Sequence, residues 1–166
     1  MKMSATSPSI DSSSPFASWK FEHAAIRVPD LDTAVAWYSE KLDFRLMSSS
    51  PLGDKVYGFM ILPAVEVSFV VELITGAGAQ NRPTYNDLAS SLGLSGYHHV
   101  AFRVDSVDDA IAELKRRDVT IVSEAHDVPK LSLRVGFFAD PWGNLFEVIQ
   151  ASGELTQSSI AHGQSS

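Results

Sequence analysis

The chain has 166 residues, of which 45% are hydrophobic and 20% are charged, and its formal net charge is −7 at pH 7. This composition is typical of a soluble globular domain, and the acidic balance leaves no continuous basic face for nucleic acid or an anionic membrane surface. Because the sequence has no cysteine, it excludes disulfides, thiolate metal sites and a cysteine nucleophile, so any metal must be held by histidine and carboxylate side chains.

Both ends of the chain are rich in serine and poor in bulky apolar residues. We expect disordered tails at 1–18 and 152–166, because such segments cannot offset the entropy of ordering. Residues 1–19 also lack the charged and apolar regions of a secretory signal, and no apolar run is long enough to span a membrane. The sequence therefore predicts a cytoplasmic protein with a single folded domain at 20–150.

The folded part contains an internal repeat. Residues 23–28 match residues 99–104 at an offset of 76 positions (99 − 23), and both segments begin with histidine. Residues 71–74 match residues 146–149 at an offset of 75 (147 − 72), and both have glutamate at the second position. The repeat predicts two modules and a linker, with module one at 20–75, the linker at 76–96 and module two at 97–150.

Each module has the predicted element order βαβββ. In module one, we expect a strand, then a helix that begins after Asp30 as its cap, then three strands, at 21–28, 31–42, 43–49, 55–62 and 66–74. In module two, Ser106 is the expected cap, and the elements lie at 97–104, 107–117, 119–123, 132–139 and 144–150. The predicted fold class is α+β: two tandem βαβββ modules form a curved, cup-like mixed sheet with the helices on the outside.

The first strand of each module is expected to direct a histidine into the cup. Side chains alternate along a strand, so His23 lies on the face opposite Ile26 and Val28, which are expected to pack on the helix. The same alternation directs His99 into the cup and leaves His98 on the other face. His98 and His126 have no repeat partner, and we expect both to be structural or surface residues.

The last strand of each module carries a glutamate within an apolar stretch. Glu72 and Glu147 are costly to bury unless they are paired or bind a metal. A single strand histidine is more often a core residue, and a single strand glutamate usually faces solvent, but independent accidents would not occupy repeat-equivalent positions. We therefore predict one divalent ion (Ni, Co, Zn, Mn or Fe) with open positions for substrate, held by His23, Glu72, His99 and Glu147.

These motifs, together with the segment at 140–147, resemble the vicinal oxygen chelate superfamily, which includes glyoxalases, bleomycin resistance proteins, epimerases and extradiol dioxygenases. The resemblance covers about 21–150 and implies metal ligands on the first and last strand of each module. The ligand set is similar to that of bacterial glyoxalase I, although Gly76 stands where that enzyme tends to have an asparagine that contacts glutathione. The modules of this superfamily pair within one chain or across a dimer, and we expect a homodimer.

The resemblance implies a lyase or isomerase that acts on a small substrate with vicinal oxygens through a metal-stabilised enolate or enediolate. Glu147, or alternatively Glu72, would be the catalytic base, and Arg27 and Arg103 would contact an anionic part of the substrate. An iron-dependent extradiol-type dioxygenase and a tailoring enzyme of secondary metabolism are alternatives. Another is a non-catalytic binding protein for aromatic drugs, with cup walls made by Trp37, Tyr57, Phe59 or Phe137.

Overall fold

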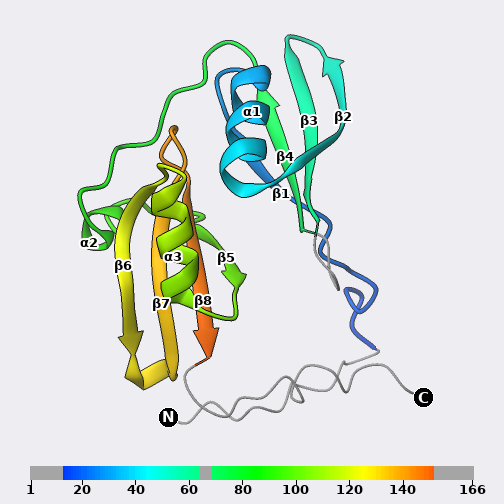
Figure 1. Cartoon of the computed structure of the whole chain (residues 1–166). Helices are drawn as coiled ribbons and strands as arrows, with labels where there is room; N and C mark the ends of the chain where they lie inside the picture. Colours follow the sequence, from blue (N-terminus) through cyan, green and yellow to red (C-terminus); the bar gives the residue numbers. More distant parts are fainter. Residues whose placement is uncertain (1–12, 64–68, 152–166) are drawn as a thin grey trace.

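The structure is a computed structural model that describes residues 13–63 and 69–151 (Figure 1). Most of the two predicted tails, 1–12 and 152–166, lies outside the described residues. Residues 13–18 form turns, in which the Ala17 amide donates to the Ser14 carbonyl at 3.1 Å. Within the described ranges, no helix is both long and apolar enough to cross a membrane.

Module one is a four-stranded mixed sheet with one helix. Strand β1 pairs in parallel with β4, and β4, β3 and β2 are antiparallel, which gives the order β1-β4-β3-β2. The elements are β1 (Ala24–Arg27), α1 (Leu31–Leu42), β2 (Arg45–Leu52), β3 (Lys55–Leu62) and β4 (Phe69–Thr75).

Module two repeats this topology with the order β5-β8-β7-β6. Its elements are β5 (His99–Arg103), α3 (Val107–Arg116), β6 (Thr120–Val128), a 3₁₀ turn (Pro129–Leu131), β7 (Leu133–Ala139) and β8 (Leu145–Ala151), and the linker contributes α2 (Leu88–Ser91). The α+β class and the two modules are confirmed. In the described chain, the strands form two separate sheets (Figure 1).

The two long helices begin at the predicted caps. The Asp30 carboxylate accepts a hydrogen bond from the Thr33 amide at 2.8 Å, and the Ser106 hydroxyl accepts one from the Asp109 amide at 3.2 Å. Each interaction satisfies an amide that has no partner within the first helical turn. Helix α1 ends at Leu42 and is capped by Asp43, which adopts the left-handed conformation with φ 58°.

Strand β2 runs from Arg45 to Leu52 rather than over 43–49, and β6 differs most from its predicted bounds. Strand β6 continues to Val128 rather than ending near 123, and its register with β7 shifts between Ile121 and Ser123 and again between Ser123 and His126. These irregularities disturb the two-residue alternation that marks a strand in the sequence. Strand β4 is described from Phe69, so part of the predicted strand 66–74 lies outside the described residues.

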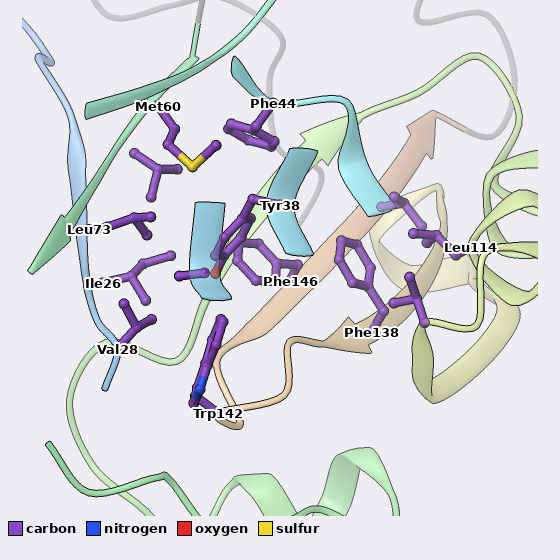
Figure 2. Packing of buried hydrophobic residues seen from close by; sticks show 14 of the residues in the cluster. Ile26, Val28, Tyr38, Phe44, Met60, Leu73, Leu114, Phe138, Trp142 and Phe146 are labelled. Atoms are coloured by element: carbon purple, nitrogen blue, oxygen red, sulfur yellow. The ribbon is translucent and has the colours of Figure 1, made fainter. Parts of the chain in front are cut away.

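The main hydrophobic core contains buried residues of both modules, and helix α1 of module one packs against module two within it (Figure 2). Tyr38 is 0% exposed, and its ring lies 6.3 Å from the rings of both Trp142 and Phe146 in module two. Its hydroxyl donates to the Asp140 carboxylate at 2.7 Å, and burial raises the pKa of Asp140. The sequence predicted both helices on the outside of the sheet, but helix α1 is packed between the modules, because Tyr38 contacts module two.

The linker contacts the sheet of module two. Tyr85 and Leu88 pack in a second hydrophobic cluster with β6, β7 and β8, which includes Phe137. Phe137 pairs with Glu147 across β7 and β8, so this cluster lies on the sheet face that carries His99 and Glu147. The linker thus covers part of the face that was predicted to hold the site.

Candidate metal centre

Each module brings one predicted histidine against one predicted glutamate. His23 Nε2 lies 3.4 Å from Glu72 Oε2, and His99 Nε2 lies 3.1 Å from Glu147 Oε2. The register produces both contacts, because Ala25 pairs with Glu72 and Ala101 with Glu147 in the parallel ladders. Each histidine is two residues before that alanine and therefore lies on the same face.

A phenylalanine flanks each pair. The ring of Phe59 lies 5.9 Å from the His23 ring, and the ring of Phe137 lies 5.3 Å from the His99 ring, both edge to face. Both phenylalanines pair with the glutamate of their module across neighbouring strands. With glutamate side chains only 15% (Glu72) and 14% (Glu147) exposed, the carboxylates are held on a largely apolar surface.

The geometry of each pair fits two neighbouring ligands of one divalent ion. Bonds of about 2.1 Å place neighbouring ligand atoms about 3.0 Å apart at an octahedral ion and about 3.4 Å apart at a tetrahedral ion. The observed nitrogen–oxygen distances of 3.1 and 3.4 Å fall in this range. A neutral imidazole and a carboxylate are also ligand types that suit Ni, Co, Zn, Mn and Fe.

The described chain does not assemble the four predicted ligands into one cluster. Within the described ranges, no three histidine, aspartate or glutamate side chains come close enough to hold one ion. His23 and His99 nevertheless line one cavity of about 410 Å³, which Arg82, Tyr97 and Phe21 also line. We call each histidine–glutamate pair a half-site, and the histidines of both half-sites line this shared cavity.

The two arginines predicted to contact substrate have different surroundings. The Arg27 guanidinium donates to the carbonyls of Val28, Ile74, Gly76 and Ala77 at 2.7 to 3.0 Å, so it also holds the turn after β4. Arg103 is exposed on β5. Their contact with substrate remains a prediction.

Sequence reasoning missed a contact made by His98. His98 Nδ1 lies 2.8 Å from His99 Nδ1, and His98 Nε2 lies 2.8 Å from the Ser91 hydroxyl of the linker. Burial, with His99 and Arg82 nearby, lowers the pKa of His98. The consecutive histidines were the available signal, but strand alternation places them on opposite faces, and His98 precedes the first residue of β5.

The comparison with protein families matches residues 20–148 to the Glyoxalase/Bleomycin resistance protein/Dioxygenase superfamily. The chain is 26% identical over 132 residues to lactoylglutathione lyase of Salmonella typhimurium, covering 78% of this chain and 90% of that protein. It is 31% identical over 137 residues to mitochondrial methylmalonyl-CoA epimerase of Bos taurus, covering 80% of this chain and 74% of the relative.

Among solved structures, glyoxalase I from Zea mays matches with a TM-score of 0.60 and 25% identity, over 79% of this chain. The chain spans 44% of that maize protein, and also 44% of a lactoylglutathione lyase of Arabidopsis thaliana to which it is 27% identical. It thus covers less than half of these plant proteins. The repeated βαβββ modules and the family match over most of the chain lead to one conclusion: the chain belongs to the Glyoxalase/Bleomycin resistance protein/Dioxygenase superfamily.

Proposed function

We propose that the protein is a divalent-metal-dependent lyase or isomerase that acts on a small substrate with two neighbouring oxygen atoms. The observation that carries this proposal is the repeated contact between histidine and glutamate, at 3.4 Å for His23 and Glu72 and at 3.1 Å for His99 and Glu147. Two such pairs supply four ligands and leave positions open at an octahedral ion. The enzyme relatives in the same superfamily support this class of reaction.

In this proposal, the four side chains hold the ion, which would supply Lewis-acid polarisation of a substrate carbonyl. The Glu147 carboxylate accepts the proton from the neighbouring C–H group and returns it to the substrate, which completes an isomerisation without an added reactant. Glu147 is 14% exposed and lies beside Phe137, so water has limited access to it. Glu72, at the equivalent position, is the second candidate base.

The names of the relatives suggest the first substrates to test. One relative is a lactoylglutathione lyase and another a methylmalonyl-CoA epimerase, at similar levels of identity to this chain. An assay in deuterium oxide detects proton transfer in either reaction. We expect solvent deuterium to enter the product at the carbon that receives the returned proton, in one of these two substrates or a related one.

We further propose that two copies of the chain complete each site. Each half-site offers two ligands, the four do not cluster among the described residues of one chain, and β1 and β5 each form the edge of their sheet. In a two-fold dimer, β1 of one copy beside β5 of the other would bring the two kinds of half-site together twice. A site built in this way requires the homodimer that we expect from the sequence.

The metal content of the purified protein, measured by elemental mass spectrometry, tests the metal site. We expect one ion per chain in the wild type and its loss in His99→Ala and Glu147→Ala. His126→Ala is the matched control, because His126 lies on β6 outside both pairs, where its Nδ1 contacts the Glu124 carbonyl at 2.8 Å. Absence of metal after reconstitution, or bound iron together with substrate-dependent oxygen uptake, would contradict the proposed reaction class.

Complementation between two inactive variants tests the two-copy site. Co-expressed His23→Ala and His99→Ala chains with different tags would form a heterodimer in which one site has lost both histidines and the other has lost neither. We therefore expect one ion and measurable activity per isolated heterodimer. A site formed within one chain would stay defective in both copies, and an inactive, metal-free heterodimer would reject the shared site.

A further inference from the structure

A chain of hydrogen bonds runs from the linker to the half-site of module two. The Ser91 hydroxyl donates to the Leu88 carbonyl at 2.6 Å and lies 2.8 Å from His98 Nε2. His98 Nδ1 lies 2.8 Å from His99 Nδ1, and His99 Nε2 faces Glu147 at 3.1 Å. Ser91 is 1% exposed, so α2 holds the first residue of this series of hydrogen bonds in a buried, defined position.

The positions of the protons follow from the first link. Because the Ser91 hydroxyl gives its only hydrogen to Leu88, its oxygen has to accept from His98, and this requires a proton on His98 Nε2. In neutral His98, Nδ1 is then an acceptor, so His99 Nδ1 donates to it. The remaining nitrogen, His99 Nε2, carries the lone pair and is the atom beside Glu147.

We propose that Ser91 and His98 are positioning residues that hold His99 in the tautomer and ring orientation that binds the metal through Nε2. This inference rests on the ligand role of His99 proposed above. Partners on the second nitrogen of a ligating histidine fix its tautomer and ring orientation, and their loss typically weakens metal affinity about 10–100-fold. The linker would thereby have a defined function: α2 would organise the half-site of module two.

The two half-sites differ in this respect. In module one, Glu22 precedes His23 and is exposed, and none of the described side chains takes the place of His98 beside His23. Strand β1 also has no counterpart of α2 before it in the described chain. We therefore expect the His99 half-site to be the better organised of the two before metal binds.

The tautomer of His98 can be measured in metal-free protein by ¹⁵N–¹H correlation spectra of the imidazole rings at about pH 8.5, about two units above the ordinary histidine pKa. We expect the proton of His98 on Nε2 in the wild type. Ser91→Ala removes the acceptor and should produce a mixture of tautomers. A wild-type His98 with its proton on Nδ1 would overturn the inference, whatever the metal content.

Metal affinity gives the second measurement, by titration with Co²⁺ against a chelator. His98→Leu should weaken binding about 10–100-fold, whereas His98→Asn, which keeps an acceptor near the Nδ1 position, should restore most of it. Ser91→Ala should lie between them, and His126→Leu is the matched control. Thermal unfolding of each metal-free variant establishes that the fold is retained.

The outcomes separate the two proposals. If the wild type binds no Co²⁺, the proposed metal-dependent function fails, and this inference fails with it. If the wild type binds Co²⁺ and both His98→Leu and Ser91→Ala bind equally well, only the positioning role is rejected. Weak binding by His98→Asn as well as His98→Leu would also reject that role, since the acceptor would then be irrelevant.

Discussion

At the scale of single residues, the Glu147 carboxylate is the group whose chemistry the proposed reaction needs most. Glu147→Gln keeps the size of the side chain but removes the base, so we expect the rate of deuterium exchange into substrate to fall about 10²–10⁴-fold. Glu124→Gln is the matched control, because Glu124 on β6 is 66% exposed and contacts Lys115. Exchange that is unchanged in Glu147→Gln would assign the base to another residue, with Glu72 the next to test.

A second residue-scale prediction concerns the buried contact between the modules. Asp140 accepts hydrogen bonds from the Tyr38 hydroxyl, from the amides of Trp142 and Asn144 and from the Asn144 side chain. Tyr38→Phe removes one donor from a buried carboxylate, and we expect the free energy of unfolding to fall by about 1–3 kcal/mol. Denaturant unfolding measures this, with Tyr57→Phe as the control, expected to change it by less than about 0.5 kcal/mol. Equal values for both variants would contradict the prediction.

At the scale of elements, the third strand of each sheet, β3 in module one and β7 in module two, carries a glycine that lets the helix pack close to the sheet. A Cβ at Gly58 in β3 would lie 2.6 Å from Leu31 Cδ1, and one at Gly136 in β7 would lie 2.8 and 2.9 Å from two atoms of Ile111. Both helices therefore pack closely on their sheets through repeat-equivalent strands.

The two glycines should nevertheless differ in their tolerance of alanine. The atom near Gly58 is the end of a flexible leucine, whereas Gly136 also meets Ile111 Cγ1, nearer the backbone. We expect Gly136→Ala to destabilise the protein by about 1–3 kcal/mol, and Gly58→Ala by less. Chemical denaturation of both variants measures the difference, and the reverse order would show that β3 and α1 adapt less than β7 and α3.

The end of helix α3 carries an ion-pair network with a defined pH dependence. Hydrogen bonds from Arg116 and Arg117 lower the pKa of Glu113 to about 2, from an ordinary value of 4.5. Because the folded pKa lies below the unfolded one, the network stabilises the fold above pH 4.5, and this contribution is lost as the pH falls towards 2. An NMR titration of the Glu113 carboxyl should give this low pKa.

The matching variant replaces both arginines. In Arg116→Gln/Arg117→Gln, the pKa of Glu113 should return towards 4.5, and the difference in stability from the wild type should shrink between pH 4.5 and 2. Added salt should reduce the effect, because these groups are exposed to solvent. A Glu113 pKa that is equal in both proteins would mean that the ion pairs do not form in solution.

At the scale of the whole molecule, metal binding should stabilise the proposed dimer. A ligand that binds only the native state adds about 2.7 kcal/mol at a concentration 100 times its Kd. We therefore expect the Tm of reconstituted protein to fall when a chelator removes the ion, and the Tm of His99→Ala to be insensitive to chelator. Scanning calorimetry with analytical ultracentrifugation also tests whether the dimer loosens. A chelator-insensitive wild-type Tm would argue against a metal that joins the half-sites.

Much of the architecture could be predicted from the sequence because it depends on local patterns and on the duplication. Apolar spacing and the caps Asp30 and Ser106 located both long helices, and the repeat identified His23, Glu72, His99 and Glu147 as one set of equivalent positions. Strand alternation and parallel pairing are properties of the backbone, so the equivalent positions take the same place in each module.

Other features depend on contacts between segments that are far apart in the chain. Tyr38 lies between the modules because Trp142, Phe146 and Asp140 surround it, and helical spacing alone cannot identify that second partner. The contact of Ser91 with His98 joins the linker to the start of β5, where alternation does not apply. By itself, the sequence determined the modules and the four repeat-equivalent histidine and glutamate positions, because periodicity and duplication act locally. Only the tertiary structure decided that each histidine meets the glutamate of its own module and that the linker contacts His98 beside His99, because these arrangements depend on how whole elements pack.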